Sequence, residues 1–211
     1  MLIFYYSIQL QVNKLEVYIY PKSRSLRVLW TLEEGGISYQ AIKVDLINNR
    51  GACKNPHPRG KVPYLVDQTV TLSETLAICL YICEKYAPFP LYPDDLHLKS
   101  QVNAWLSYAV TDLESPIWNL VKQKILLHEE MQNRILIDQF IHQAYTAIEA
   151  IGTINNEWIA GSDFSLADIF IAHNLYWARA CGISLNTDAE NYINRAMTRK
   201  ACLKALVKNN R

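Results

Sequence analysis

The sequence is short of net charge, of closely spaced cysteines and of long apolar runs. Its 21 lysine and arginine residues are nearly balanced by 20 aspartate and glutamate residues. Binding to DNA or RNA normally requires a strong positive field that neutralises phosphates. The balance of charge therefore argues against a nucleic-acid partner, and the sequence has no internal repeat or low-complexity tract.

No two cysteines form a CxxC pair. The five cysteines are an odd number and are widely spread, at Cys53, Cys79, Cys83, Cys181 and Cys202. This spread predicts reduced thiols in a reducing compartment, so we expect a cytoplasmic protein. Cys79 and Cys83 share a helix face, but no histidine pair lies near them in the sequence. We interpret them as buried thiols and predict no metal site.

The start of the chain is apolar, since residues 1–14 begin MLIFYYSIQLQ. This segment lacks a basic leading region and a small-residue cleavage site, and it is far shorter than the ~20 apolar residues of a membrane span. We therefore expect neither a signal peptide nor a membrane anchor. Its alternating apolar residues leave two interpretations open, an added edge strand or an upstream start codon.

Half of the residues are hydrophobic, which predicts a globular protein with a buried core. Residues 15–20, LEVYIY, alternate and are rich in strand-forming residues, which predicts a strand. Residues 23–34 show helical spacing up to a Gly-Gly stop, and residues 39–46 predict a second strand. The opening unit is therefore predicted to be βαβ, with parallel strands.

The next segment predicts a hairpin, a buried helix and a linker. VPYLV and VTL flank a turn at residues 67–69, which is typical of an antiparallel hairpin. Residues 74–86 place apolar side chains all around a helix, so we expect two buried faces. Residues 87–95, APFPLYPDD, contain three prolines and predict a stiff linker. We therefore predict one domain over residues 15–86 and a second over residues 96–208.

Beyond the linker, the apolar periodicity is helical throughout. Apolar residues at i, i+3, i+4 and i+7 begin at Val102 and again at Ile137, and Pro116 is expected to kink the first helix. The stretch FSLADIF predicts a helix start, with Ser165 as N-cap and Asp168 three residues later. The last 17 residues hold six bases and no acid. We expect these bases on a solvated helix face, with an anion or lipid-surface contact as the alternative.

Four stretches in this order resemble the cytosolic glutathione transferases, in particular bacterial-like, serine-type members. They are YPKSRSLRVLWTLEEGGISYQAIKVDL, HPRGKVPYL, LSETLAI and FSLADIF. The resemblance implies an α/β plus all-α fold, with a thioredoxin-like N-terminal domain (βαβ-α-ββα) followed by an all-helical C-terminal domain.

The same resemblance implies glutathione as co-substrate and a homodimer. It implies an enzyme that joins the glutathione sulfur to a small hydrophobic electrophile or reduces small organic peroxides. A non-catalytic scaffold with this fold is the first alternative, and a glutathione-dependent isomerase or dehalogenase is the second.

A thiol with a pKa near ~8.5 is mostly protonated at neutral pH, so such an enzyme must stabilise the bound thiolate. A hydroxyl that donates to the sulfur at the start of a helix does this. Ser23 lies at the expected junction of strand and helix, four residues before Arg27, a spacing similar to that of the serine-type classes. Our hypothesis is that Ser23 is catalytic. Ser25, Tyr18 and Tyr20 remain alternatives, and a plain helix cap is the non-catalytic interpretation.

The resemblance also implies how glutathione binds. Pro63 resembles the family's cis-proline, which leaves the Val62 backbone free to pair with the peptide. Glu74 and Thr75 lie where a helix begins, so they are expected to hold the γ-glutamyl end through backbone N–H groups, the hydroxyl and the carboxylate. The expected glutathione-binding residues are Lys61, Val62, Pro63, Ser73, Glu74 and Thr75.

For the second substrate, the aromatic residues on the first helix of the second domain are the candidates. These are Trp105, Tyr108 and Trp118, although aromatic residues at helical spacing also belong to cores. His57 and His173 receive no role.

Overall fold

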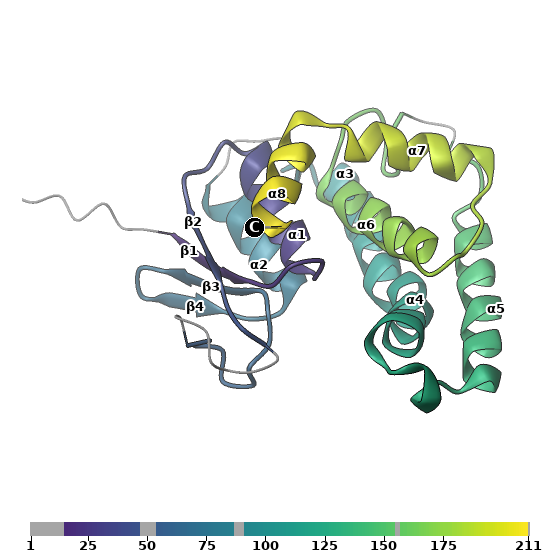
Figure 1. The fold of residues 1–211 in the computed structure, drawn as a ribbon. Coiled ribbons are helices and arrows are strands. Elements are labelled where there is room, and N and C mark those ends of the chain that lie inside the picture. Colours follow the sequence, from purple (N-terminus) through teal and green to yellow (C-terminus); the bar gives the residue numbers. More distant parts are fainter. Residues whose placement is uncertain (1–14, 47–53, 87–90, 155–156, 211) are drawn as a thin grey trace, which may run out of the picture.

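A computed structural model of the protein describes residues 15–46, 54–86, 91–154 and 157–210. A mixed sheet carries helices on one face, and a helical domain lies on the far side of those helices (Figure 1). The fold class predicted from the sequence, a thioredoxin-like domain followed by an all-helical domain, is confirmed. Two features discussed above, the possible edge strand in residues 1–14 and Cys53, lie outside the described residues.

The sheet contains four strands in the order β2-β1-β3-β4. Their bounds are β1 Glu16–Ile19, β2 Gln40–Lys43, β3 Tyr64–Asp67 and β4 Val70–Leu72. Strand β1 pairs parallel with β2 and antiparallel with β3, and β3 pairs antiparallel with β4. The predicted βαβ unit and the predicted hairpin are therefore both present, and the hairpin turns at Gln68, whose φ is +57°.

Helices α1 (Ser25–Glu34) and α2 (Thr75–Lys85) cover the same face of the sheet. In β1, Val17 and Ile19 are buried, whereas Glu16 and Tyr18 are only partly covered, so the helices pack on one side of the pleat. Because α6 and α8 lie against its outer side, α1 is buried over most of its length. This sandwiched position fixes the start of α1, where Ser23 lies.

Helix α2 buries less of its apolar surface than the sequence predicted. Ile78, Cys79, Ile82 and Cys83 form one buried stripe, but Leu76 and Leu80 are only partly covered. The expectation of two buried faces is therefore wrong for the single chain. Apolar composition all around a helix shows that its surface is apolar, but it does not show how many neighbours cover it.

The segment between β2 and β3 differs from the implied βαβ-α-ββα order in its described part. Residues 54–63 form turns and bends and contain no helix, and residues 47–53 lie outside the described residues. Asn55 holds this loop together, since its side chain accepts from the His57 N–H at 3.0 Å and donates to the Lys61 carbonyl at 3.1 Å. The loop ends in a cis peptide bond between Val62 and Pro63, as the resemblance implied.

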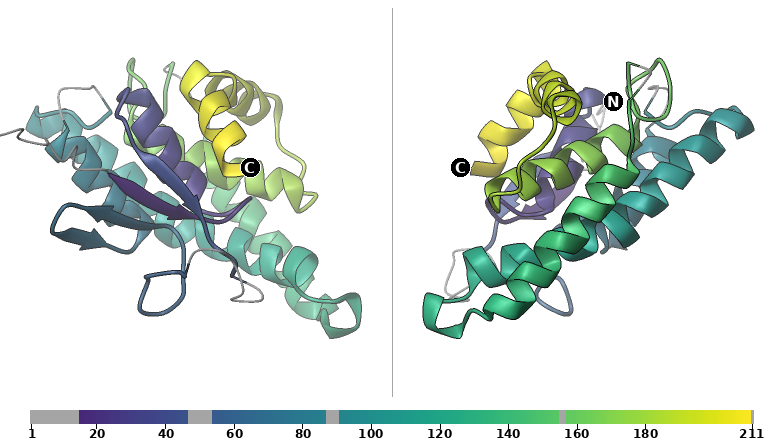
Figure 2. Two further views of the ribbon diagram at one scale, coloured as in Figure 1. Left: turned by 60° about the vertical axis from the view of Figure 1, so that its left-hand side comes forward. Right: turned by 90° about the vertical axis from the view of Figure 1, so that its right-hand side faces the viewer.

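The second domain is built from helices joined by loops in its described residues. Its helices are α3 Leu96–Tyr108, α4 Glu114–Val121, α5 Arg134–Ala150, α6 Leu166–Ala180, α7 Thr187–Met197 and α8 Lys200–Asn210. Short turns join some of them, π-helical at Ala109–Leu113 and Lys122–Leu126 and 3-10 at Glu129–Met131. Figure 2 shows α3, α4 and α5 as the long edge of this domain, with α6 between them and α1.

The predicted kink at Pro116 corresponds to the π-helical turn Ala109–Leu113, just before the proline. Pro116 has no N–H to donate to the carbonyl of Asp112, so the helix cannot keep its normal ladder at this point. The helix widens there, and the Glu114 N–H bonds to the Ala109 carbonyl instead. This widening precedes Glu114, whose side chain reaches the first domain.

The basic C-terminal residues form the expected solvated face only in part. Arg195, Lys200 and Lys204 are exposed, but two others pair with the first domain. Lys208 donates to Glu33 at 2.6 Å, and Arg199 forms two bonds to Glu34 at 2.6 and 2.8 Å. Because Glu33 and Glu34 end α1, the charges of α8 are directed at the first domain, against which α8 lies (Figure 1). Among the described residues, no helix is both long and apolar enough to cross a membrane.

Candidate functional site

Strand pairing brings three separate segments to one edge of the sheet. Tyr18 of β1 lies opposite Tyr64 of β3, so the end of β1 lies beside the cis-Pro63 segment that precedes β3. Leu65 of β3 lies opposite Leu72 at the end of β4, so the residues that start α2 reach the same edge. The turn after β1, the Val62-Pro63 segment and the start of α2 therefore lie together, as the sequence implied.

Ser23 lies in the turn between β1 and α1. Its hydroxyl donates to the Tyr20 carbonyl at 2.7 Å and lies 2.8 Å from the Ser25 hydroxyl. The backbone N–H of Ser25 also donates to the Ser23 oxygen, at 3.1 Å. Ser23 therefore acts as a local cap, which is the non-catalytic role considered above, but its partly exposed hydroxyl is not confined to that role.

The number of hydrogen bonds that each serine hydroxyl can form favours Ser23 over Ser25 for the catalytic role. A hydroxyl has one hydrogen to donate and two lone pairs. When Ser23 donates to Tyr20, the 2.8 Å contact requires Ser25 to be the donor. Ser25 is fully buried, so it supports Ser23 from behind. Ser23 is then free to exchange the Tyr20 carbonyl for another acceptor, while two donors polarise its oxygen.

The two tyrosines fit the catalytic role less well. The Tyr18 hydroxyl donates to Glu16 at 3.1 Å, and its ring lies 6.4 Å from that of Tyr64, on the face of the sheet away from α1. Tyr20 contributes its backbone, since its N–H lies 3.4 Å from the Ser25 hydroxyl and its carbonyl accepts from Ser23.

The start of α2 has the features of an anion site. Glu74 precedes it with φ of +69°, a backbone conformation that residues other than glycine rarely adopt. No side chain caps this helix start, and Thr75 behind it is buried. Uncapped N–H groups and the positive end of the helix dipole favour a carboxylate at this point. Ser73 lies just before this turn and is partly buried.

Two charged side chains flank that helix start. The exposed Glu74 carboxylate pairs with Arg59 at 2.6 Å, a contact that sequence reasoning missed. Exposed ion pairs contribute little free energy, so Arg59 is readily displaced by an incoming ammonium group. Lys61 is exposed on the same loop, and its backbone carbonyl is held by Asn55.

A buried ionic cluster joins the turn to the helical domain. Arg27, with 1% of its surface exposed, donates to Glu114 at 2.6 Å, to Asn174 at 2.5 Å and to His173 Nδ1 at 2.9 Å. Burial lowers the pKa of Arg27, and Glu114 opposes that shift. Burial alone raises the pKa of Glu114, but the charges and hydrogen bonds of Arg27 and Arg24 outweigh it and hold the pKa below its usual range. The cluster is therefore ionised.

Arg24 is the exposed member of this cluster. Its Nε donates to Glu114, and its guanidinium carbon lies 4.3 Å from the Trp118 ring centroid and 5.4 Å from that of Trp177. Trp118 and Trp177 stack on each other at 5.6 Å. Trp118, which the sequence suggested for the substrate pocket, thus lies next to the Ser23 turn.

Trp105 and Tyr108 occupy a different part of the helical domain. Their rings meet edge to face at 5.8 Å, and the Tyr108 hydroxyl donates to the Ala147 carbonyl of α5 at 2.5 Å. Tyr108 therefore directs its polar end at α5 and not at the Ser23 turn. The structure brings only Trp118 of the three suggested aromatics to Arg24.

Helix α8 also reaches the Ser23 turn. Asn209 is 2% exposed, and its carboxamide donates to the Tyr20 carbonyl and accepts from the Lys22 N–H, both at 3.3 Å. Lys22 has φ of +57°, so this turn is held in a conformation that needs external support. Asn209 was missed from the sequence because nothing in its local pattern links it to residues near the start of the chain.

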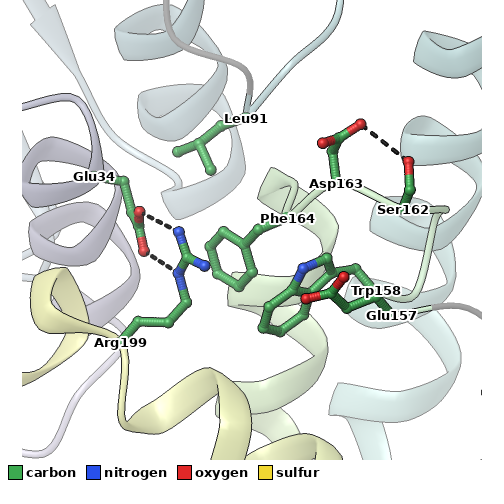
Figure 3. A pocket seen from close by; sticks show the side chains of 8 residues that line it. All are labelled: Glu34, Leu91, Glu157, Trp158, Ser162, Asp163, Phe164 and Arg199. Atoms are coloured by element: carbon green, nitrogen blue, oxygen red, sulfur yellow. Dashed lines mark hydrogen bonds and ion pairs between the residues drawn. The ribbon is translucent and has the colours of Figure 1, made fainter.

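A cavity of about 360 Å³ lies at the opposite end of α1 (Figure 3). Its lining includes Glu34, Trp158, Phe164 and Arg199. A ten-residue helix is roughly 15 Å long, so this cavity is separate from the Ser23 turn. The Arg199–Glu34 ion pair forms one of its walls.

The described cysteines are poor nucleophiles. Cys79, Cys83, Cys181 and Cys202 are free and buried, and burial raises the pKa of Cys79 and of Cys202 to about 12. No group of three or more histidine, cysteine, aspartate or glutamate side chains within the described ranges is placed to hold a metal ion. The chemistry of the site therefore depends on hydroxyls, helix starts and arginines.

Comparison with known proteins gives a consistent result. Residues 13–84 match the family description "Glutathione S-transferase, N-terminal domain". Glutathione S-transferase Z1 of Arabidopsis thaliana is 30% identical over 177 residues, which cover 79% of this chain and 78% of that protein. Maleylacetoacetate isomerase of Pseudomonas aeruginosa is 29% identical over 184 residues, 82% of this chain and 85% of that protein. Among solved structures, poplar glutathione transferase F1 superposes with a TM-score of 0.76 at 25% identity, covering 93% of this chain and 98% of that chain.

Proposed function

Because the chain belongs to the glutathione S-transferase family, we propose that it binds glutathione at the edge of the sheet and joins its sulfur to small electrophiles. One observation carries the proposal: strand pairing brings Ser23, the cis-Pro63 segment and the start of α2 to the same edge. Helices α1 and α2 both begin there, so two positive dipole ends face a bound anion.

Each part of glutathione has a matching group. The Val62 backbone, which lies just before β3, pairs with the cysteinyl unit as an added strand. The uncapped start of α2 and the Thr75 hydroxyl take the γ-glutamyl carboxylate, with Ser73 beside them. Glu74 takes the ammonium group in place of Arg59, and Lys61 is available for the glycyl carboxylate.

Ser23 then stabilises the thiolate. Its hydroxyl turns from the Tyr20 carbonyl towards the sulfur, while Ser25 continues to donate to its oxygen. The thiol proton leaves to solvent. In substitution on a chloro-nitroarene, the sulfur lone pair forms the C–S bond and the C–Cl bond breaks, so that chloride leaves with the electron pair.

A second candidate is glutathione-dependent isomerisation, which the similarity to a maleylacetoacetate isomerase favours. The same thiolate adds to a conjugated double bond, the carbon–carbon bond rotates, and the sulfur leaves again. Glutathione is regenerated in this reaction, whereas conjugation consumes it. Measuring glutathione consumption alongside product formation separates the two activities.

We also propose that the protein acts as a cytoplasmic homodimer on small hydrophobic electrophiles. The partly covered side of α2, with Leu76 and Leu80, supports a second copy as its neighbour. Buried free thiols support a reducing compartment. Light scattering of the purified chain tests the dimer, since a monomeric mass would contradict it.

Ser23→Ala tests the catalytic assignment. We expect kcat/KM with an activated chloroarene to fall on the order of 10²-fold, because one donor to a developing or bound anion is lost. The pKa of bound glutathione, followed through near-ultraviolet thiolate absorbance, should rise by about 1–2 units. Ser184→Ala, at an exposed serine of the helical domain, is the matched control. Unchanged turnover and unchanged absorbance in Ser23→Ala would show that another group holds the sulfur.

A further inference from the structure

Arg24 directly follows Ser23, and the helical domain holds its guanidinium in place. Nε donates to Glu114, and the flat guanidinium lies over Trp118. The side chain remains 28% exposed. It is therefore fixed in orientation and still partly open to solvent.

Most donors of Arg24 are unused. A guanidinium has five N–H groups, and only the one on Nε has a hydrogen-bond partner among the described residues. The two terminal nitrogens form the fork that binds a carboxylate with two parallel hydrogen bonds. Arg27, by contrast, uses Nε and both terminal nitrogens on protein partners. The two arginines therefore have different roles in the same cluster.

The charge of the cluster is not balanced. Arg24 and Arg27 carry two positive charges, and Glu114 carries the single negative charge that faces both. His173 accepts from Arg27 through Nδ1, so its ring is neutral. One positive charge is left over, and Arg24 is the member exposed to solvent. Because the surroundings are partly desolvated, this charge attracts an anion more strongly than a surface arginine does.

The surroundings of Arg24 also define the rest of the ligand. Trp118 and Trp177 form a stacked pair beside the guanidinium, and Trp118 is only partly buried. Trp177 is buried, so the exposed part of Trp118 is the aromatic surface that a flat apolar or aromatic group can contact. The combination is a cation with free paired donors beside an aromatic surface, one residue from the proposed thiolate donor.

We propose that Arg24 sets the substrate specificity of this site and selects electrophiles that carry a carboxylate on a flat, apolar body. This inference rests on the proposed function for the location of the reacting sulfur, and it goes beyond that function by naming the charge of the second substrate. The guanidinium offsets the charge of the carboxylate, which otherwise repels the nearby thiolate. Arg24 is a binding residue here, and the reacting bonds remain those of sulfur and carbon described above.

Equilibrium binding tests the inference without turnover. The probes are dinitrobenzoate and dinitrobenzamide, which have the same ring and differ in the charged group, and neither carries a leaving chloride. Binding is followed by calorimetry on the full chain with saturating glutathione and again without it. The wild type should bind the benzoate at least ~10-fold more tightly than the benzamide, since a bidentate, charge-assisted pair forms only with the benzoate.

Arg24→Gln should weaken benzoate binding on the order of 10-fold or more and remove most of the preference over the benzamide. Arg24→Lys still places a positive charge beside Glu114 but lacks the two-pronged guanidinium. Its preference for the benzoate over the benzamide should therefore be intermediate. Arg179→Gln is the matched control, because Arg179 is an exposed arginine of α6 paired with Glu190. If Arg24→Gln fails to fold, the comparison of wild type with Arg24→Lys decides the outcome. Equal affinities of the wild type for the two probes would overturn the proposal.

Turnover separates failure of this inference from failure of the proposed function. The substrates are chloro-dinitrobenzoate and the corresponding benzamide, each corrected for its uncatalysed rate with glutathione. The ratio of kcat/KM for the two should fall ~10-fold or more in Arg24→Gln. Catalysis of both substrates with an unchanged ratio overturns the role of Arg24 and leaves the transferase standing. If the wild type turns over neither substrate but still binds the benzoate more tightly than the benzamide, the transferase proposal is overturned and the carboxylate-binding role of Arg24 stands.

Discussion

At the scale of single residues, the ion pairs that join the two domains depend on protonation states that burial controls. His173 is 1% exposed and accepts from Arg27 through Nδ1. Burial, together with the charges of Arg27 and Arg24, lowers the pKa of His173 well below its ordinary value of 6.5. The folded protein therefore keeps this ring neutral at pH values where the unfolded chain protonates it.

This difference predicts that the free energy of unfolding falls as the pH falls below about 6.5. At such pH values His173 binds a proton in the unfolded state but not in the folded state. The slope for one such group approaches about 1.4 kcal/mol per pH unit. His173→Asn keeps an acceptor for Arg27 and removes the titration, so its unfolding free energy should depend less on pH between about 5 and 7. Urea unfolding at several pH values measures this.

The control for that experiment is His142→Asn, at an exposed position of α5. Burial and the charge of Arg59 also lower the pKa of His57, so part of the wild-type slope should remain in every variant. An identical pH dependence in the wild type and in His173→Asn would show that the His173 ring is not kept neutral.

At the scale of elements, α6 is the best-supported helix start. The Asp168 carboxylate accepts from the Ser165 N–H and hydroxyl at 2.8 and 2.9 Å, which completes the predicted capping box. It also accepts from the Ile159 N–H at 2.8 Å and the Tyr192 hydroxyl at 2.7 Å. One buried carboxylate thus ties the loop before α6, the helix itself and α7 together.

Asp168→Ala should therefore lower the unfolding free energy by about 3 kcal/mol or more, because several buried donors lose their acceptor at once. Asp163→Ala is the control, since Asp163 is exposed and, among the residues that the structure describes, hydrogen-bonds only to Ser162 in the same loop. It should change stability by less than about 0.5 kcal/mol. Chemical denaturation of both variants checks this, and equal losses would contradict the special role of Asp168.

The elements that were predictable are those whose signals are local. Strand β1 alternates, α1 ends at Gly35 and the FSLADIF stretch carries its own cap, so each appears in a few consecutive residues. Arg199 and Lys208 were misassigned to a solvated face because their partners Glu34 and Glu33 belong to α1, far away in the sequence. A charged stripe looks the same in a sequence whether water or another helix faces it.

At the scale of the whole molecule, the two domains share one buried ionic cluster. Arg27 of α1 reaches Glu114, His173 and Asn174 across the junction. These partners are 87 to 147 residues away in the sequence, and no periodicity or spacing rule connects them. Motifs in the sequence suggested Ser23 and the loop at residues 54–63 as candidates. Arg24, Glu114 and Asn209 became candidates only because folding places them beside that turn and its ionic cluster.

Glu114→Gln should destabilise the whole chain by about 3–5 kcal/mol, because Arg27 is left as a buried charge without its counter-ion. The pKa of Glu114 is held below its ordinary value of 4.5, so this stabilisation is present above that pH and is lost as the pH falls below it. The double variant Arg27→Met with Glu114→Leu should recover part of the loss, since it removes both charges. Urea unfolding compares the three proteins, and a Glu114→Gln variant as stable as the wild type would show that the pair is not needed.

The hydrogen bonds from Asn209 to Tyr20 and Lys22 have a practical consequence for anyone who purifies this enzyme. A preparation in which a protease has trimmed the last turn of α8 keeps every residue that we propose to contact glutathione or the electrophile. It nevertheless loses the hydrogen bonds that hold the turn carrying Ser23, the proposed thiolate donor. Such material should migrate almost normally on a gel and bind affinity resin, yet turn over slowly, so intact mass should be verified before weak activity is attributed to the wrong substrate.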